Sequence, residues 1–366
     1  MKLDFPSIVK VFDFHGEYFD ICPYGIGHIN DTYAVHYQNS NRSPHRYILQ
    51  RVNHAVFIDP PGVMHNIQGV TGHLQGKILE NGGNPERETL NIIPTLDGET
   101  YYRCHQGNYW RAYTFIEDAH SYETVESLDH AYTSAKTIGN FQRWLGDFPI
   151  EDLNETIIDF HNTPKRYQNF LQVLQSDSHN RARFVYNEIE FINQRASDMS
   201  VFTSLQEQGV LPNRVTHNDT KFNNVLIDDF TGEGICLVDL DTVMPGLSLY
   251  DFGDAVRIAA SSAPEDEQDL SKVYLDLDIY EKITHGYLDA TRDILTTAEV
   301  DNLTLSTKLM TLECGMRFLT DYLDGDQYFK IHRHNHNLDR SRTQFKLVQD
   351  IEDKFDQMEA IVDRYK

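Results

Sequence analysis

The hydrophobic periodicity of the chain changes near residue 118, and this change limits the folds that the sequence can adopt. Before it, short apolar stretches with alternating polar residues predict strands at 21–25, 31–37, 46–52, 99–103 and 109–116. After it, apolar residues recur every three or four positions, which is typical of helices. A chain of 366 residues is also too long for one ordinary core. We therefore expect an α+β protein with a small antiparallel sheet at 1–118 and a mainly helical part at 119–366.

Further elements can be placed from the same patterns. Helices are expected at 61–80, 127–145, 155–175, 181–208 and 340–364. Short β-branched stretches at 214–216, 225–229 and 235–240 predict strands, so residues 217–224 form a loop between strands. Functional residues are often found on such loops, because the flanking elements hold them rigidly.

Composition excludes several classes of protein. The chain carries 32 basic and 56 acidic residues, a net charge of -24, which repels nucleic acid and anionic membrane surfaces. The amino-terminal segment lacks the clean apolar stretch of a signal peptide, and no run of about 18 apolar residues occurs. The four cysteines are far apart and form no zinc or redox motif. We expect a cytoplasmic protein that binds neither nucleic acid nor membrane.

The segment His217 to Asp228, H-N-D-T-K-F-N-N-V-L-I-D, carries the strongest functional signal. Asp219 precedes Asn224 by five residues, which is the HxDxxxxN spacing of kinase catalytic loops. In such loops the carboxylate accepts the proton of the acceptor hydroxyl, and the amide oxygen binds magnesium. Lys221 lies two residues after the carboxylate, where it could meet the transferring phosphoryl group. The spacing predicts a phosphoryl-transfer loop.

A second carboxylate, Asp239, ends a strand twenty residues after Asp219 and is predicted to join Asn224 in binding Mg²⁺. Each residue also has a structural interpretation: Asp219 alone could be a turn residue, and His217 could orient the loop by hydrogen bonds. For Asp241 two interpretations remain open, one as a residue that assists the metal through water and one as a hydrogen-bond partner of the following loop.

The tripeptide Asp251-Phe252-Gly253 spells the metal motif of protein kinases, but we interpret it differently. It follows Asp219 by 32 residues, beyond the strand pair that carries Asp239. The stretch D-F-G-D-A-V-R-I-A-A predicts the start of a helix, with Asp251 near its amino-terminal end.

Candidate nucleotide contacts lie in the sheet region. Gly25 and Gly27 flank a hairpin turn, at which a kinase folds a loop over the phosphates of ATP. Gln50 and Arg51 stand where a kinase has a lysine on its third strand, so the lysine itself is missing. Glu117, at the end of the sheet region, completes the set.

These residues resemble the aminoglycoside phosphotransferase and choline kinase superfamily, whose fold is the two-lobed protein kinase fold. The stretches YGIGHINDTY, VDLDTVMPG and LECGMRFLTDYL are similar to those of bacterial N-acetylhexosamine 1-kinases, and the resemblance covers nearly the whole chain. It implies that ATP and Mg²⁺ are used to phosphorylate the anomeric hydroxyl of N-acetylglucosamine or N-acetylgalactosamine. These sugar kinases also lack the lysine that Gln50 replaces here.

The resemblance also implies residue roles. Asp219 would be the base and a sugar contact, Asn224 and Asp239 the magnesium ligands, and His28, Arg317 and Tyr328 further contacts of the amino sugar. Two alternatives remain: a kinase of another small alcohol, such as choline, an aminoglycoside or a different sugar, and an inactive nucleotide-binding scaffold. The sequence does not determine the oligomeric state.

Overall fold

The structure, a computed structural model, describes residues 4–25, 29–38 and 44–366. The chain divides into two compact units, each built from separate segments. Unit 1 contains Met1–Ser121, Asp147–Ile158 and Val225–Pro245; unit 2 contains Tyr122–Gly146, Asp159–Asn224 and Gly246–Lys366. Residues 147–158 and 225–245 thus pack with unit 1, although they follow the boundary expected near residue 118.

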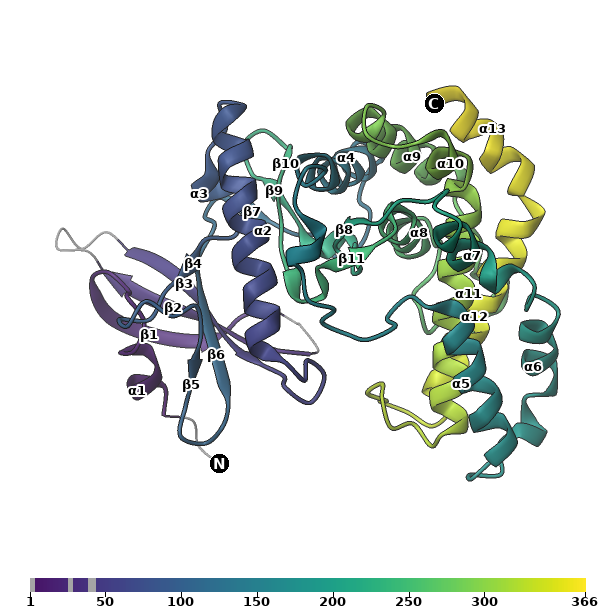
Figure 1. The fold of residues 1–366 in the computed structure, drawn as a ribbon. Coiled ribbons are helices and arrows are strands. Elements are labelled where there is room, and N and C mark those ends of the chain that lie inside the picture. Colours follow the sequence, from purple (N-terminus) through teal and green to yellow (C-terminus); the bar gives the residue numbers. More distant parts are fainter. Residues whose placement is uncertain (1–3, 26–28, 39–43) are drawn as a thin grey trace. The chain divides into compact units, whose positions relative to one another are not determined.

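Unit 1 contains an antiparallel sheet with the strand order β1-β2-β3-β6-β4, and β5 pairs with β6 (Figure 1). Its strands are β1 (Glu17–Pro23), β2 (Asp31–Gln38), β3 (Pro44–Val52), β4 (Ile92–Ile93), β5 (Tyr102–Arg103) and β6 (Tyr109–Thr114). Four expected strands are confirmed with shifted ends. The fifth, expected at 99–103, is only two residues long.

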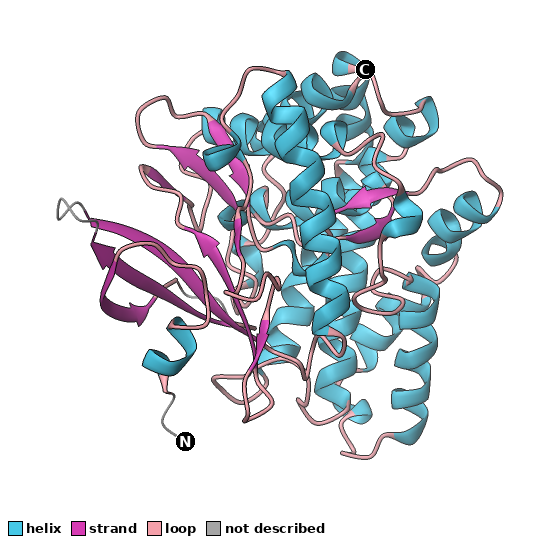
Figure 2. Cartoon of the chain, turned by 60° about the vertical axis from the view of Figure 1, so that its left-hand side comes forward, coloured by secondary structure: helices cyan, strands magenta, loops and turns pink. Residues whose placement is uncertain are grey.

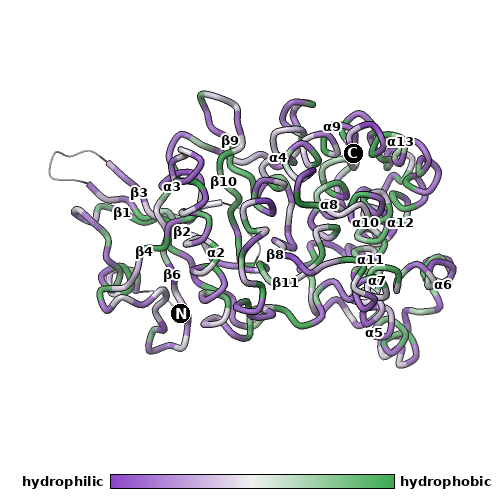
Figure 3. Tube along the Cα trace, turned by 45° about the horizontal axis from the view of Figure 1, so that its top comes forward, coloured by the Kyte–Doolittle hydropathy of each residue, from purple (hydrophilic) through white to green (hydrophobic). Residues whose placement is uncertain are grey.

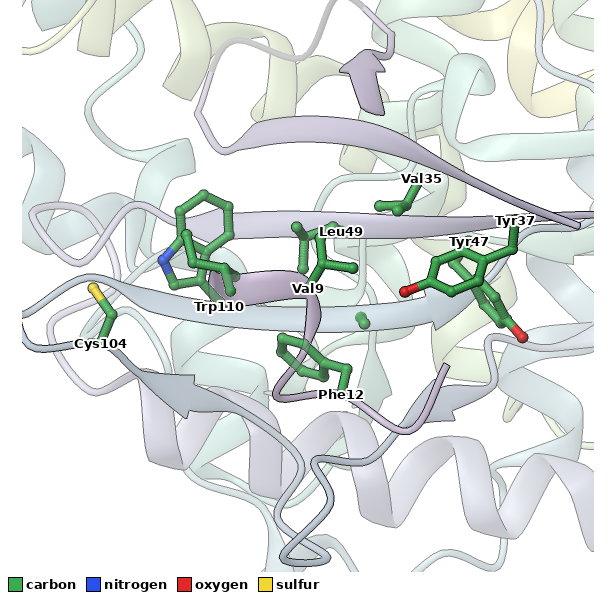
Figure 4. Close-up of a cluster of buried hydrophobic side chains, with 10 residues drawn as sticks. Val9, Phe12, Val35, Tyr37, Tyr47, Leu49, Cys104 and Trp110 are labelled. Atoms are coloured by element: carbon green, nitrogen blue, oxygen red, sulfur yellow. The ribbon is translucent and has the colours of Figure 1, made fainter. Parts of the chain in front are cut away.

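One face of this sheet is apolar because side chains alternate along each strand. Tyr37 of β2, Leu49 of β3 and Trp110 of β6 lie on this face. Val9 and Phe12 from the amino-terminal segment pack in the same cluster (Figure 4). The short helix α1 (Phe5–Val9) thereby covers the apolar face, which leaves the opposite face of the sheet for other contacts.

The rest of unit 1 consists of two helices and a second, small sheet. The helices are α2 (Pro60–Glu80), which confirms the helix expected at 61–80, and α3 (Pro85–Glu88). The second sheet has the order β10-β9-β7, formed by β7 (Ala119–His120), β9 (Val225–Asp228) and β10 (Gly234–Leu237). The trace is hydrophobic along much of β9 and β10 (Figure 3), as expected for short buried strands.

Unit 2 is mainly helical (Figure 2). Its helices are α4 (Leu128–Trp144), α5 (Thr163–Ser176), α6 (Tyr186–Asn193), α7 (Val201–Glu207), α8 (Ser248–Ala259), α9 (Leu277–Thr291), α10 (Thr297–Asp301), α11 (Leu303–Leu323), α12 (His336–Asp353) and α13 (Phe355–Tyr365). The short strand β8 (Arg214–Thr216) also belongs to unit 2, whereas β11 (Met244–Gly246) begins in unit 1 and ends at the first residue of the next unit 2 segment. None of the helices in the described part of the chain is both long and apolar enough to cross a membrane.

Three expected helices differ from those in the structure. The helix expected at 155–175 begins only at Thr163, because Asn162 caps it and Asp159 has a positive φ of 55°. The helix expected at 181–208 is two separate helices, α6 and α7. The long charged helix expected at 340–364 is interrupted at Lys354, which separates α12 from α13.

Two glycines allow α4 and α9 to pack closely. A Cβ at Gly139 of α4 would lie 2.7 Å from Cβ of Ala290, and a Cβ at Gly286 of α9 would clash with the carbonyl oxygen of Tyr132. Since backbone cannot move aside as a flexible side chain can, only glycine fits at position 286 without separating the helices.

We predict that Gly286→Ala destabilises unit 2 by about 1 to 3 kcal/mol, because the added methyl group overpacks the helix contact. Calorimetry would show a lower Tm. Gly76→Ala in α2 is the matched control: a Cβ there meets nothing within 4 Å, so stability should rise by up to about 1 kcal/mol. An unchanged Tm for Gly286→Ala would show that the α4–α9 contact is not tightly packed.

Candidate active site

The loop that carries Asp219 lies in unit 2 and follows β8 directly. Residues 217–221 form an irregular segment, and a short 3-10 turn at Phe222–Asn224 ends it. Asn218 adopts a left-handed conformation with φ of 63°, which asparagine tolerates better than most residues. The loop conformation is therefore specified locally by residue type, but its position depends on contacts with α8.

Asp251 of α8 holds this loop through its backbone. The carboxylate accepts hydrogen bonds from the backbone N–H of His217 at 3.0 Å and of Asn218 at 2.7 Å. Thr220 donates its hydroxyl to the carbonyl oxygen of Asp251 at 2.6 Å. Gln142 of α4 donates a further bond to the carboxylate at 2.7 Å. Burial raises the pKa of Asp251, while the N–H donors and His217 act in the opposite direction.

The sequence interpretation of the Asp-Phe-Gly tripeptide is confirmed in one respect: Asp251 lies in the first turn of α8. Its role as the anchor of the loop from His217 to Asn224 was missed. The glycine has a packing role as well, since a Cβ at Gly253 would lie 2.6 Å from Cγ of Met310 in α11.

Asp219 lies beside two polar partners in the loop. Lys221 Nζ is 2.9 Å from its carboxylate, and Asn224 Nδ2 donates to the backbone oxygen of Asp219 at 2.9 Å. Although burial opposes it, the charge of Lys221 holds the pKa of Asp219 below its usual value. The carboxylate is therefore ionised at neutral pH and is able to accept a proton. Because the amide nitrogen of Asn224 faces Asp219, its Oδ1 remains as the atom that suits a hard cation.

A buried acid–histidine pair connects this loop to α11. His161 Nδ1 lies 2.9 Å from Glu313 of α11, and its Nε2 lies 3.5 Å from the backbone oxygen of Asn218. Thr163 donates its hydroxyl to the other oxygen of Glu313 at 2.6 Å. Although burial opposes it, the hydrogen bond from His161 lowers the pKa of Glu313. Sequence reasoning missed this pair, since no motif relates residues about 150 positions apart.

Arg317 lies one turn after Glu313 on α11 and is surrounded by aromatic rings. Its guanidinium carbon lies 6.0 Å from the ring centre of Tyr328, and 5.3 and 5.6 Å from those of Phe160 and Phe329. The structure therefore brings together two of the expected sugar contacts, Arg317 and Tyr328. The third, His28, lies outside the described residues.

The segment that carries Tyr328 is held by another buried carboxylate. Asp321 accepts hydrogen bonds from the backbone N–H of Gln327 at 2.8 Å, Tyr328 at 2.7 Å and Phe329 at 2.9 Å. The backbone of Tyr328 is thus fixed, while 59% of the residue's surface is exposed. An exposed phenol on an anchored backbone is available to a ligand.

Arg166 adds a second guanidinium group near Arg317. It donates two hydrogen bonds to the carbonyl oxygen of Phe160, at 3.2 and 3.0 Å. Burial and the neighbouring charge of Arg317 lower the pKa of Arg166. Arg166 and Arg317 thus place two guanidinium charges close together beside α11.

The candidate nucleotide contacts lie in unit 1. Gly25 has a φ of 72°, which favours glycine, and Gly27 lies outside the described residues. Gln50 and Arg51 point to opposite faces of β3: Gln50 bonds to Thr32, whereas Arg51 pairs with Asp31. A ligand on one face of the sheet would meet only one of them.

Glu117 forms an ion pair with Arg46, whose guanidinium lies 3.7 Å from the ring centre of Phe115. This pair bridges β3 and the segment after β6. The role of Glu117 in nucleotide binding stays a prediction.

The predicted second metal ligand, Asp239, also lies in unit 1. It follows β10 in a left-handed conformation with φ of 62°. Asp241, two residues later, is 2% exposed and pairs with Arg111 of β6. No group of three or more His, Cys, Asp or Glu side chains among the described residues could hold a metal ion. The metal ligands predicted from the sequence, Asp239 and Asn224, do not form such a group, because they are one carboxylate and one amide.

Comparison with known proteins assigns this fold to a class. The fold is similar to that of an aminoglycoside phosphotransferase from Alicyclobacillus acidocaldarius, with a TM-score of 0.64 and 12% identity over 100% of this chain and 98% of that chain. It is also similar to a microcompartment-associated aminopropanol kinase, with a TM-score of 0.59 and 15% identity over 96% and 97%. An amicoumacin kinase in complex with AMP-PNP and Ca²⁺ matches with a TM-score of 0.56 and 13% identity over 96% of this chain and 94% of that chain. The expected α+β fold, a small antiparallel sheet with a helical part, is thereby confirmed.

A family model shows more than the fold. The model of the APH phosphotransferase enzyme family matches residues 20–283, which include both Asp219 and Asp239. The chain therefore belongs to this family of phosphotransferases.

We predict that Asp251→Asn destabilises the protein by about 1 to 3 kcal/mol, because the new amide group would face an N–H donor. The catalytic loop would shift, so kcat should fall together with Tm. Asp353→Asn on the exposed end of α12 is the control and should change stability by no more than about 0.5 kcal/mol. Wild-type Tm and kcat in Asp251→Asn would contradict the anchoring role.

Proposed function

We propose that this phosphotransferase is an N-acetylhexosamine 1-kinase, which transfers the γ-phosphate of ATP to the anomeric hydroxyl of N-acetylglucosamine or N-acetylgalactosamine. The observation that carries the proposal is the grouping of Arg317 and Tyr328 beside Glu313, whose partner His161 contacts the catalytic loop. The two predicted sugar contacts are thus linked to the loop of the predicted base, because His161 contacts both α11 and this loop.

In the proposed reaction Asp219 accepts the proton of the anomeric hydroxyl as its oxygen attacks the γ-phosphorus. The bond between this phosphorus and the β-phosphate oxygen breaks, and ADP leaves. Lys221 stabilises the charge on the transferring phosphoryl group. Asn224 and Asp239 would hold Mg²⁺, which neutralises the phosphate oxygens. The pairing of these two ligands rests on the spacing of the sequence motif.

The charges around α11 favour a neutral acceptor over a cationic one. Arg166 and Arg317 interact electrostatically, and the nearby Glu313 already has partners in His161 and Thr163. A quaternary or primary amine beside these two guanidinium groups would therefore meet like charge. This argues against choline or an aminoglycoside as the acceptor, whereas the hydroxyl and acetamido groups of a sugar accept hydrogen bonds from guanidinium groups.

The inactive scaffold is not favoured. Asp219, Lys221 and Asn224 are in mutual contact in the loop, with the carboxylate ionised, as a working phosphotransferase requires.

We predict that Asp219→Asn lowers kcat by about 10² to 10⁴, because general-base catalysis contributes a factor of this size. Calorimetric titration with ATP and Mg²⁺ should give an affinity close to that of the wild type, since the base does not hold the nucleotide. Near wild-type turnover would remove Asp219 from the mechanism.

We predict a glycosyl 1-phosphate as the product, which phosphorus-31 NMR would identify and reducing-sugar reagents would not detect. A 6-phosphate, which still reduces, would overturn the anomeric specificity and leave the phosphotransferase activity in place. The same assay with choline and with aminoglycosides tests the alternative acceptors.

The sugar contacts can be tested with the same assay. Arg317→Ala and Tyr328→Phe should each weaken hexosamine use by about 1 to 3 kcal/mol in kcat/KM, since a buried partner on the sugar is left unpaired. Arg183→Ala is a matched control, because its guanidinium also lies over an aromatic ring, 4.6 Å from the centre of Phe184. Equal effects of Arg317→Ala and Arg183→Ala would contradict the assignment.

A further inference from the structure

Gln50 stands on β3 where a kinase has a lysine, and a buried cation, Arg111, lies beside it. Gln50 of β3 lies directly opposite Arg111 of β6, and Nε of Arg111 donates to Gln50 Oε1 at 2.9 Å. Gln50 in turn donates to Thr32 of β2 at 3.0 Å. A chain of side chains therefore crosses three neighbouring strands on the face of the sheet opposite the apolar cluster.

Arg111 is only 1% exposed, so its charge needs a partner. That partner is Asp241, which is bonded to Nη1 and is itself 2% exposed. The ring of Tyr113 lies 5.4 Å from the guanidinium carbon and contributes a cation–π contact. Removing two charges from water is costly, so an ion pair buried this deeply contributes little net stability to the fold. Its presence therefore suggests a role other than stabilisation.

The loop that begins at Asp239 is held at two further points. Asn30 donates its side-chain amide to the second oxygen of Asp241 at 2.5 Å and accepts from the backbone N–H of Asn53 at 2.9 Å. Asn66 of α2 donates to the carbonyl oxygen of Val243 at 2.8 Å. Contacts from the sheet and from α2 therefore fix residues 241 to 243.

These contacts separate the roles of the two neighbouring carboxylates. Both oxygens of Asp241 already accept hydrogen bonds from protein side chains, which fits a structural partner better than a metal ligand. Asp239 lies two residues earlier, on the backbone that Asp241 holds. The sequence left open a hydrogen bond from Asp241 to the loop that follows it, whereas its partners in the structure are Arg111 of β6 and Asn30.

We propose that Arg111 is a positioning residue, which holds Asp241 and thereby fixes Asp239 for the divalent cation that accompanies the nucleotide. Together with Gln50 it thereby connects the sheet to the segment that carries Asp239 and Asp241. This inference rests on the proposed use of a nucleotide and Mg²⁺ and is independent of which acceptor is phosphorylated.

The test compares Mg²⁺-dependent ADP binding in the wild type and in the double variant Arg111→Met/Asp241→Leu. Removing both charges avoids an unpaired buried charge, so the double variant should fold where Arg111→Met alone could fail. Calorimetric titrations with ADP at a series of Mg²⁺ concentrations give the Mg²⁺ concentration for half-maximal binding. We expect this concentration to rise about tenfold or more, as for other residues that orient metal ligands. KM for the hexosamine should stay within about twofold.

Two further variants complete the design. Arg111→Lys keeps the charge but cannot bond to Gln50 and Asp241 in the same forked geometry, so its Mg²⁺ requirement should be intermediate. The control is Arg195→Met/Glu352→Gln in unit 2, which removes an ion pair of 2.6 Å from α12 and should leave the Mg²⁺ requirement unchanged.

Three results would overturn the inference. One is a folded double variant with the Mg²⁺ requirement of the wild type. Another is an equal loss of ADP affinity at every Mg²⁺ concentration, which would mean that Arg111 contacts the nucleotide itself. The third is a wild-type protein that binds no ADP with Mg²⁺, which would overturn the proposed function as well. Mg²⁺-dependent ADP binding without phosphorylation of a hexosamine would overturn only the proposed acceptor, and the comparison of variants would still decide the role of Arg111.

Discussion

The conformation of the loop from His217 to Asn224 depends on the hydrogen bonds that the carboxylate of Asp251 accepts from it. A loop of irregular backbone cannot satisfy its own N–H groups, so each buried donor needs a partner elsewhere. Asp251 supplies this partner for His217 and Asn218 from the first turn of α8. The loop then presents Asp219 without a regular element of its own. Because α8 packs against α11 through Gly253, the position of the loop is coupled to the helical core of unit 2.

Buried carboxylates hold other segments and side chains of the protein as well. Asp321 accepts the N–H groups of the segment around Tyr328, Glu313 holds His161 and Thr163, and Asp241 holds Arg111. A chain with 56 acidic residues uses most of them to charge its surface, and a few buried ones to fix loops. Each buried carboxylate accepts several hydrogen bonds, which offsets the cost of removing its charge from water. Buried acids therefore fix the loop that carries Asp219 and the segment that carries Tyr328.

Much of the secondary structure could be predicted from the sequence, because it depends on local periodicity. The helix expected at 127–145 is α4, with ends within one residue, and the strand expected at 31–37 is β2. Predictions failed where turn chemistry interrupted a helical pattern. Asp159, with its positive φ, keeps residues before 163 out of α5, and a break at Lys354 divides the last helix. Polar residues in such places fit an exposed helix and a turn equally well, so the sequence pattern does not distinguish them.

By itself, the sequence determined the α+β class and the loop from His217 to Asn224, because residue spacing within a loop fixes which side chains can act together. Only the tertiary structure decided which distant groups support them. Asp251 is bonded to residues 33 and 34 positions away, Arg111 to Asp241 at 130, and Thr163 to Glu313 at 150. A buried hydrogen bond of this kind depends on how helices and strands pack, and packing leaves no periodic trace in the sequence. The chemistry of the loop is therefore local information, whereas its support is a property of the folded chain.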